Sequence, residues 1–385
     1  MSEPTFSGNT EWDSTQVFNT SARGPARPAP RIDWVHSLRV VEGAAIGRRR
    51  RLEADELTIG RREGLAWTLH DREVSSLHCS VRAVPGDEPL LVTDHQSTNG
   101  TFIDGQRVQG QARLPDRGLL QVGAHVLLHE FRPREEMELA EQADRDLARA
   151  RHYVEALLPP PMHDGPVRTE WFYRPSATLG GDAFGLADLG GGRLAGYVID
   201  VCGHGAGAAM HTVSVMNVLR QRALPDTDLA DPAQVLTRLN AMFQMDEHDG
   251  LYFTMWYGAY DVATRELAYA SAGHHPAYVR PAEDDGAPLA PLSTRSLAIG
   301  TLPDSVYRTE KRVMAPGERL YIFSDGLFEV TAADGRAWSL ADLLPLIERS
   351  DRSSGEPERL YRAVRKATGD RPLEDDCSIV TVTFL

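Results

Sequence analysis

Short apolar runs separated by turn residues make up the first third of the chain. They occur at 38–41, 57–59, 79–84, 90–93, 101–103, 106–108 and 126–128. Short strands at regular spacing with glycine-rich connections predict an all-β sandwich, and Asp104-Gly105 is a typical hairpin turn. Because no helical period interrupts this segment, we expect one β domain at 37–132.

A helix with well-marked ends follows this domain. Pro133 precedes Glu135 and Glu136, so a proline stands in the first turn and acids lie near the positive end of the helix dipole. The prolines at 159–161 end the helix at Leu158, which predicts a helical linker at 133–158. Two sets of residues recur at heptad spacing, namely Ala140, Leu147 and Val154, and Ala143, Ala150 and Leu157. About three heptads are compatible with packing against the chain's own domains or with a dimerising stalk, and both stay open.

The remainder, 159–385, mixes strand and helix patterns. Strands are predicted at 168–174, 183–186, 194–200, 253–261, 266–271, 320–324 and 377–384. Helices are predicted at 206–223, 232–245, 339–349 and 356–368. Strand clusters with hairpin-like joins, separated by helices, indicate an antiparallel α+β sandwich covered by helices rather than a doubly wound sheet. The expected fold class is therefore multidomain.

Residues 1–36 have a different composition. Thr, Ser, Asn, Gly and Pro dominate, and 25–30 is typical of an extended linker, so a disordered tail is expected. Within it, Thr15 is followed shortly by Val17 and Phe18, two apolar side chains that a solvated tail does not need. This stretch is either incidental or a recognition motif.

Composition and charge narrow the class of protein. Of 385 residues, 42% are hydrophobic and 25% charged, as in soluble globular proteins, and no apolar run approaches the roughly 20 residues that span a bilayer. The net charge of -14 argues against a nucleic-acid or anionic-membrane partner. No secretory signal opens the sequence, so a cytoplasmic location is expected. The short basic cluster Arg48 to Arg51 is expected to be a solvated loop.

The three cysteines, Cys79, Cys202 and Cys377, are far apart and odd in number, and each follows or lies in an apolar run. We expect small buried thiols rather than disulfides or metal ligands.

Acidic residues recur at the ends of apolar elements in the last part of the chain. They are Asp182, Asp200, Asp325 and the pair Asp375-Asp376. A single Asp in such a turn is usually a cap, but four acidic positions of this kind without a Cys or His cluster suit Mg²⁺ or Mn²⁺. Two such ions can activate a bridging water and stabilise charge on a phosphoryl group.

Three residue groups in the β domain are characteristic when taken together. They are Gly60-Arg61, Ser75-Ser76-Leu77-His78 and the run Asp94-His95-Gln96-Ser97-Thr98-Asn99-Gly100-Thr101. A guanidinium, two hydroxyls and an Asn amide on neighbouring loops can hold a phosphate. In this order and spacing the groups resemble the forkhead-associated (FHA) domain, which implies binding of a phosphothreonine peptide.

Carried over by position, Arg61 and Ser75 bind the phosphate of that peptide. Ser76 and Thr98 assist, and Asn99 holds the peptide backbone. We expect His78 to be structural, hydrogen-bonded beneath the loops.

The last part of the chain also carries a resemblance, through an ordered series of motifs. They are Leu158-Pro159, Tyr173-Arg174-Pro175, Gly180-Gly181-Asp182, Asp200-Val201-Cys202-Gly203-His204-Gly205, Ala272-Gly273-His274-His275-Pro276, Phe323-Ser324-Asp325-Gly326 and Asp375-Asp376-Cys377-Ser378. Residues 157–385 thereby resemble the SpoIIE-like branch of the PPM (type 2C) protein phosphatases. The resemblance implies a serine/threonine phosphatase with two Mn²⁺ or Mg²⁺ ions on an αββα sandwich.

By the same resemblance Asp200 bridges both metals and the Val201 carbonyl joins it. Asp182, Asp325 and Asp375 complete the set of ligands, with Asp375 preferred to Asp376. We expect His204 and His274 to stabilise turns, and Arg174 to lie on the surface.

The sequence thus predicts a metal-dependent phosphoprotein phosphatase with an FHA module. The SpoIIE-like branch acts on phosphoserine of small anti-anti-sigma-factor proteins, and the resemblance implies that substrate class. The alternative is a phosphopeptide-binding adaptor with an inactive phosphatase fold. Since Thr15-Gln16-Val17-Phe18 resembles the tails that some FHA domains bind in cis, the FHA partner is another phosphoprotein or the chain's own tail phosphorylated at Thr15. The linker helix is a candidate for transmitting the state of the FHA module to the metal site.

Overall fold

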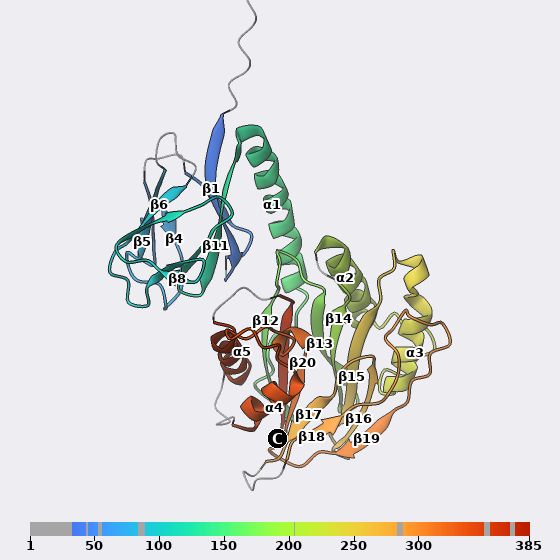
Figure 1. Ribbon diagram of the computed structural model, residues 1–385. Coiled ribbons are helices and arrows are strands. Elements are labelled where there is room, and N and C mark those ends of the chain that lie inside the picture. The colour runs from blue at the N-terminus through green and yellow to red at the C-terminus, as the bar shows by residue number, and fades with distance from the viewer. Residues whose placement is uncertain are drawn as a thin grey trace, which may run out of the picture. The chain divides into compact units, whose positions relative to one another are not determined.

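The computed structural model describes residues 33–43, 45–52, 56–83, 89–203, 205–282, 288–349, 355–369 and 374–385. Thr15 and nearly all of the expected tail lie outside the described residues, as does His204. The described chain forms a β sandwich, a long helix and a mixed sandwich of sheets and helices (Figure 1), which confirms the predicted fold class.

The first sandwich consists of two sheets. One has the strand order β2-β1-β11-β10-β7-β8 and the other β4-β3-β5-β6-β9, with only β3 and β4 parallel. The strands are β1 (Trp34–Glu42), β2 (Arg49–Arg51), β3 (Leu57–Gly60), β4 (Trp67–Thr68), β5 (Cys79–Ala83), β6 (Leu90–Asp94), β7 (Thr101–Ile103), β8 (Gln106–Arg107), β9 (Gln111–Leu114), β10 (Leu119–Val122) and β11 (His125–Pro133). Alternate residues, such as Leu38 and Val40, point into a core that also holds Trp67.

The basic cluster at 48–51 corrects one prediction, because Arg49 and Arg51 lie in strand β2 rather than in a solvated loop. Residues two apart on a strand share a face, and here that face meets helix α1 (Arg134–Glu155). Arg51 donates to both carboxylate oxygens of Glu141, at 2.9 and 2.8 Å. Arg49 pairs with Glu130 and donates from Nε to Asp144 at 2.7 Å. The two guanidiniums therefore hold α1.

Helix α1 packs on its own chain along one face. Met137 and Val154 are buried, and Leu147 and Val154 join a small cluster with Leu179 and Ala209. One predicted heptad set therefore faces the protein, as the packing alternative requires. In the other set Ala143 and Ala150 are exposed.

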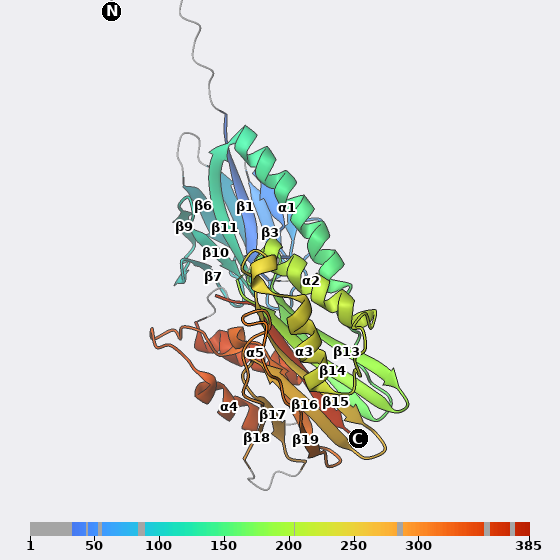
Figure 2. The same cartoon turned by 90° about the vertical axis from the view of Figure 1, so that its right-hand side faces the viewer.

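The second sandwich has two antiparallel five-stranded sheets, with the orders β12-β21-β20-β17-β18 and β13-β14-β15-β16-β19. Their strands are β12 (Val167–Arg174), β13 (Asp182–Gly190), β14 (Arg193–Val201), β15 (Phe253–Asp261), β16 (Glu266–Ala272), β17 (Ala277–Arg280), β18 (Ala290–Leu292), β19 (Glu310–Val313), β20 (Arg319–Phe323) and β21 (Cys377–Phe384). The helices are α2 (Ala206–Arg220), α3 (Pro232–Met242), α4 (Leu340–Glu348) and α5 (Glu356–Ala367). Helices α2 and α3 cover the β13–β16 sheet, and α4 and α5 cover the other (Figure 2), so the predicted αββα order is confirmed.

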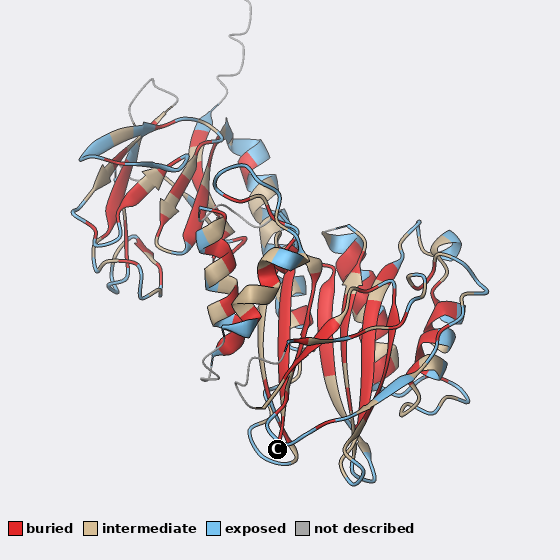
Figure 3. Ribbon diagram, turned by 60° about the horizontal axis from the view of Figure 1, so that its bottom comes forward, coloured by how far each residue is buried: buried red, intermediate tan, exposed pale blue. Residues whose placement is uncertain are grey.

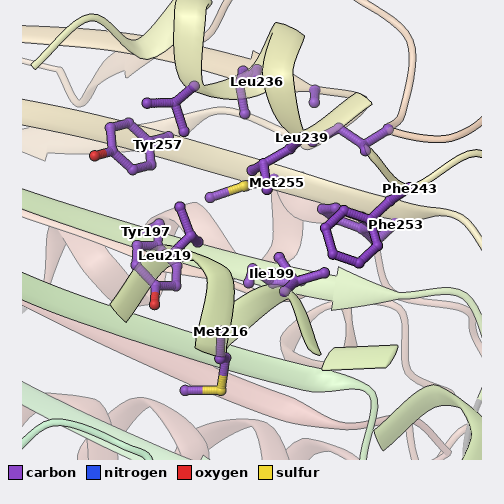
Figure 4. Close-up of a cluster of buried hydrophobic side chains, with 14 of the residues drawn as sticks. Tyr197, Ile199, Met216, Leu219, Leu236, Leu239, Phe243, Phe253, Met255 and Tyr257 are labelled. Carbon is purple, nitrogen blue, oxygen red and sulfur yellow. The ribbon is translucent and has the colours of Figure 1, made fainter. Parts of the chain in front are cut away.

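The two faces of β14 explain where this domain places its polar residues. Tyr197 and Ile199 pack under α2 and α3 (Figure 4), whereas Val198 packs between the two sheets. The strands of both sheets are largely buried, and exposed residues concentrate in loops and on outer helix faces (Figure 3). By the two-residue period, Asp200 shares the inter-sheet face with Val198.

Two further expectations concern thiols and membranes. Cys79 and Cys377 are buried in strands as predicted, but Cys202 is half-exposed in the turn after β14, where its sulfur accepts the Tyr252 N–H. All three thiols are free.

None of the helices in the described ranges is both long enough and apolar enough to cross a bilayer.

Candidate metal centre and phosphate-binding loops

Two of the predicted metal aspartates face each other across a strand pair. Asp182 begins β13 and lies directly opposite Asp200, near the end of β14. Residues opposite each other in an antiparallel pair project from the same face. Because Asp200 faces the space between the sheets, both carboxylates enter one end of the sandwich, and the Asp182 side chain is only 2% exposed.

The other two aspartates come from the facing sheet. Asp325 opens the short helix η2 (Asp325–Leu327), which follows β20, and Asp375 lies just before β21, the neighbour of β20. Gly326 makes this meeting possible, because a β-carbon there would overlap the Asp376 carbonyl oxygen. The two turns that carry Asp325 and Asp375 therefore pack tightly.

The carboxylates perturb one another strongly. Burial raises the pKa of Asp182 well above its usual range, and Asp200 and Asp376 add to this rise. Burial, with Asp325, Asp375, Asp376 and Glu329, raises the pKa of Asp200 to about 8. Burial, with Asp375 and Glu329, raises the pKa of Asp325 to about 6. Each raised pKa reflects buried carboxylates that lie close together without enough positive charge nearby. A divalent cation would supply that positive charge.

The donor set fits hard cations. One oxygen of Asp182, Oδ2, is buried without a hydrogen-bond partner among the described residues. Within those residues, no three His, Cys, Asp or Glu side chains lie close enough to enclose an ion by themselves. Mg²⁺ keeps several waters and is usually bound through one or two carboxylates, so pairs of aspartates suit it better than a closed protein cage.

Asp376 has a different environment from Asp375. Its carboxylate accepts the Gly181 N–H at 2.6 Å, and the N–H and hydroxyl of Ser176 at 2.7 and 2.9 Å. Thr212 of α2 donates to the Gly181 carbonyl at 2.5 Å. Asp376 thus positions the loop before Asp182, whereas Asp375 is exposed, and the choice of Asp375 as the ligand stays a prediction.

Glu329 is a further acidic residue near the aspartates that the sequence motifs did not predict. It lies one turn beyond Asp325, its N–H donates to the Asp325 carbonyl at 2.7 Å, and its charge raises the pKa of both Asp200 and Asp325. The four-residue spacing after the Ser-Asp-Gly motif was the available signal, since it returns the chain to the same side of a helical turn.

His274 lies in a turn as the sequence suggested, whereas Arg174 is half-buried against aromatic rings rather than on the surface. His274 is buried in the turn that joins the two sheets, and its Nδ1–H donates to the His275 carbonyl at 2.8 Å. The Arg174 guanidinium stacks over the rings of Phe172 and Tyr361, at 5.6 and 5.7 Å from their centroids. Tyr361 belongs to α5, so Arg174 faces the outer helix layer rather than the carboxylates.

The candidate phosphate-binding residues of the first sandwich lie on three neighbouring loops. The Arg61 N–H donates to the Ser75 carbonyl at 2.8 Å, and the Thr98 N–H donates to the Ser75 hydroxyl at 3.0 Å. The Asn99 amide donates to the Glu73 carbonyl at 2.8 Å. These bonds bring Arg61, Ser75, Thr98 and Asn99 together, with the exposed Ser76 beside them.

His78 supports these loops from below. The Ser75 N–H donates to His78 Nδ1, and His78 Nε2–H donates to the Gly100 carbonyl, both at 3.1 Å. Accepting at one nitrogen and donating at the other requires a neutral ring, and burial lowers its pKa accordingly. The predicted structural role of His78 is confirmed.

Comparison with known proteins gives the family. A family model described as "Stage II sporulation protein E (SpoIIE)" matches residues 190–385, which is half of the chain. The chain belongs to the SpoIIE family. A second model, described as "FHA domain", matches residues 57–123, the part of the first sandwich that carries the candidate phosphate-binding loops.

Curated relatives match about half of the chain. Phosphoserine phosphatase RsbP of Bacillus subtilis is 30% identical over 193 residues, which cover 49% of this chain and 46% of RsbP. Phosphoserine phosphatase RsbU of the same organism is 28% identical over 187 residues, covering 48% of this chain and 54% of RsbU. The chain thus matches about half the length of each of these relatives.

A solved structure supports the fold of the SpoIIE-family domain. The SiaA-PP2C domain of Pseudomonas aeruginosa superposes with a TM-score of 0.54 at 20% identity, covering 64% of this chain and 98% of that domain. This likeness shows a shared αββα architecture.

Proposed function

We propose that the protein is a metal-dependent phosphatase that hydrolyses phosphoserine or phosphothreonine on a signalling protein. The observation that carries the proposal is the meeting of aspartates from two facing sheets, with pKa values raised by burial and by one another. Such a group is costly to keep without cations, and it is the oxygen-rich set that Mg²⁺ or Mn²⁺ prefers.

The roles that we propose for the residues are those that the family resemblance implies. Asp182, Asp200, Asp325, Asp375 and the Val201 carbonyl would hold two ions. Two bound ions supply an activated water and offset the charge on the phosphoryl group. Asp376 and Thr212 hold Gly181 and thereby orient Asp182.

The decisive assay is hydrolysis of p-nitrophenyl phosphate with Mn²⁺. We expect Asp200→Asn to lose at least about 100-fold in kcat, because one of these ligands is removed. Asp164→Asn, which changes an exposed aspartate away from the site, is the control. Equal rates for wild type and Asp200→Asn would favour the alternative, an adaptor with an inactive phosphatase fold.

The substrate we propose is a phosphoserine-bearing anti-anti-sigma factor. Support comes from the family to which the chain belongs and from the names of its relatives, which are phosphoserine phosphatases. We place this activity in the cytoplasm, where such regulators act. Phosphate release from a phosphorylated anti-anti-sigma protein should exceed release from an unrelated phosphoserine protein at equal concentration, and equal release would reject this substrate class.

For the FHA module we propose recognition of phosphothreonine by Arg61, Ser75, Ser76, Thr98 and Asn99. Arg61→Ala should abolish capture of phosphothreonine peptides, because the guanidinium supplies the charge-assisted bonds. Arg62→Ala removes an adjacent exposed arginine and is the matched control. If both variants bind like wild type, the proposed site is wrong.

A tail phosphorylated at Thr15 is a candidate ligand for the same module in cis. The tail is covalently linked to the module, so its effective concentration is high and an external peptide must compete with it. Phosphorylation of Thr15 should therefore weaken binding of an external phosphothreonine peptide by about tenfold or more. If phosphorylated and unmodified protein bind that peptide equally well, the tail is not the ligand.

The outer face of α1 supports a proposed homodimer. Leu139 and Tyr153 are 73% and 55% exposed there, near the exposed Ala143 and Ala150. Sedimentation analysis of Leu139→Glu should show a shift to monomer. A monomeric wild-type protein would exclude this interface.

A further inference from the structure

Large apolar side chains are exposed on three elements near the Asp200 turn. Met210 is 71% exposed on α2, Met242 is 37% exposed at the end of α3, and Tyr252 is 38% exposed just before β15. Single exposed apolar residues are ordinary, but a group beside a functional site marks a surface that binds another molecule.

Backbone contacts tie this surface to the metal centre. The Cys202 N–H donates to the Tyr252 carbonyl at 3.0 Å, and the Tyr252 N–H donates to the Cys202 sulfur at 3.3 Å. Cys202 is two residues beyond Asp200, which limits their separation to about 7 Å along an extended chain. Tyr252 therefore lies beside the turn that carries the central metal aspartate.

A cluster of rings joins the two backbone segments that carry the methionines. His211, which follows Met210, contacts the rings of Phe243 and His248, with centroids at 5.3 and 5.2 Å. Phe243 follows Met242 directly, and Figure 4 shows Phe243 beside Phe253, at the end of the core near Ile199. The ring contacts thus place the part of α2 that carries Met210 beside the segment 242–252, next to the site.

The same segment carries unbalanced negative charge. Asp246, Glu247 and Asp249 are exposed, and none of them forms an ion pair with any residue that the structure describes. An apolar centre with an acidic edge is complementary to a partner that has an apolar anchor and basic neighbours. Anionic lipid and nucleic acid are negatively charged like this acidic edge, so the edge repels them.

We propose that Met210 and residues 242–252 form a docking surface for the protein substrate, and that this substrate carries an apolar anchor and basic residues near its phosphorylated side chain. The inference rests on the proposed phosphatase function. A metal centre can engage the phosphate of any phosphoprotein, so selectivity among phosphoproteins has to come from contacts outside it. This surface is adjacent to the centre and supplies such contacts.

The test compares two phosphoserine peptides that differ only around the phosphoserine. One carries a leucine and three arginines, and the other carries the same leucine and three glutamates. Wild type should hydrolyse the basic peptide with about tenfold or higher kcat/KM, mainly through KM, and the advantage should shrink as salt rises. The triple variant Asp246→Asn/Glu247→Gln/Asp249→Asn should lose most of this preference.

The matched control removes three exposed acids elsewhere, as Asp164→Asn/Asp226→Asn/Glu348→Gln. Asp226 and Asp249 have similar positive φ angles, 51° and 53°, which asparagine tolerates, so the two triple variants carry comparable backbone risk. The control should keep the preference for the basic peptide.

The apolar anchor is tested by Met210→Gln, with Val313→Gln as its control. Val313 is 67% exposed on β19, at the opposite end of the sheet from Asp200. Met210→Gln should raise KM about threefold to tenfold for a leucine-containing peptide relative to one in which serine replaces the leucine. Val313→Gln should leave this difference as it is in wild type.

Hydrolysis of p-nitrophenyl phosphate distinguishes failure of the phosphatase proposal from failure of the docking proposal alone. If wild type does not hydrolyse it with Mn²⁺, the phosphatase proposal fails and the docking proposal fails with it. If wild type hydrolyses it but treats the two peptides alike, or if the triple variant keeps the full preference for the basic peptide, only the docking surface is overturned.

Discussion

At the scale of single residues, Asp375 and Asp376 have the same side chain but different exposure and different hydrogen-bond partners. Asp376 is 3% exposed and accepts three hydrogen bonds from the loop that precedes Asp182, whereas Asp375 is exposed. Both charges raise the pKa of Asp200, but the hydrogen bonds that Asp376 accepts offset its repulsion.

Replacing each of the two by Asn should therefore affect metal-free stability in opposite directions. Asp376→Asn should lower the free energy of unfolding by about 1–3 kcal/mol, because a buried hydrogen-bond acceptor is lost. Asp375→Asn should leave this stability equal or higher, since it relieves repulsion on Asp200 and Asp325. Urea unfolding in EDTA measures both changes.

Activity provides the second readout for this pair. Asp375→Asn should reduce p-nitrophenyl phosphate hydrolysis at every Mn²⁺ concentration. Asp376→Asn should mainly raise the Mn²⁺ concentration needed, by about 10-fold to 100-fold, as expected for a residue that orients a ligand. The reverse pattern would show that Asp376 is the ligand.

The raised pKa values predict how stability depends on pH. Asp200 and Asp325 have folded pKa values of about 8 and about 6, against an ordinary value of 3.8. The folded state thus binds protons more tightly than the unfolded state, so metal-free stability should fall as pH rises from about 4 to about 8. Urea unfolding in EDTA at about pH 5 and about pH 8 checks this slope.

Two controls accompany the pH experiment. Mn²⁺ should restore stability most strongly at the higher pH, because the ionised carboxylates then bind it. Asp200→Asn should flatten the slope in EDTA. A metal-free protein that becomes more stable over this range would contradict the assignment of these aspartates to one mutually repelling cluster.

At the scale of secondary-structure elements, ion pairs tie strand β2 to strand β11 and to helix α1. The side chains of Arg49 and Glu130 are each only 5% exposed. Those of Arg51 and Glu141 are 18% exposed. Removing one member of a buried pair leaves an uncompensated charge, which costs more than losing a pair that water can reach.

Arg49→Met should therefore destabilise the protein by about 3 kcal/mol or more, and Arg51→Met by less. Urea unfolding with fluorescence detection measures both values. In Arg49→Met, a second change of Asp144 to Asn should recover part of the loss, because Arg49 is the ion-pair partner of Asp144, whereas Glu130 also pairs with Arg39 and Arg132. Equal effects of the two single variants would contradict the buried network.

At the scale of the whole molecule, the two proposed sites recognise phosphate through different kinds of interaction. One uses a guanidinium and neutral hydrogen-bond donors, and the other uses carboxylates that need cations. They lie in separate sandwiches with separate hydrophobic cores.

The two activities should therefore be separable by mutation. Arg61→Ala should abolish phosphothreonine-peptide binding and keep p-nitrophenyl phosphate hydrolysis within about twofold. Asp200→Asn should do the reverse. Fluorescence anisotropy with a labelled peptide and the colorimetric phosphatase assay check this, and loss of both activities in either variant would show that the sites are coupled.

The sequence by itself determined the two sandwiches, the helix between them and the acidic positions at strand ends. Hydrophobic periods and turn residues are local properties, so β14 and β21 were read correctly from their apolar runs. Short strands with weak patterns, such as β4, β9 and β19, were missed, because they owe their form to their partners in the sheet.

Only the tertiary structure decided which side chains meet. The sequence predicted that the arginines of β2 are solvated, but in the folded chain they pair with Glu141 and Asp144 of α1. Asp375 and Asp376 could be ranked by family resemblance, but only the fold shows the hydrogen bonds that Asp376 accepts from Ser176 and Gly181, about 200 residues away. Burial, hydrogen bonds and charge repulsion depend on neighbours in space, and a linear pattern does not contain them.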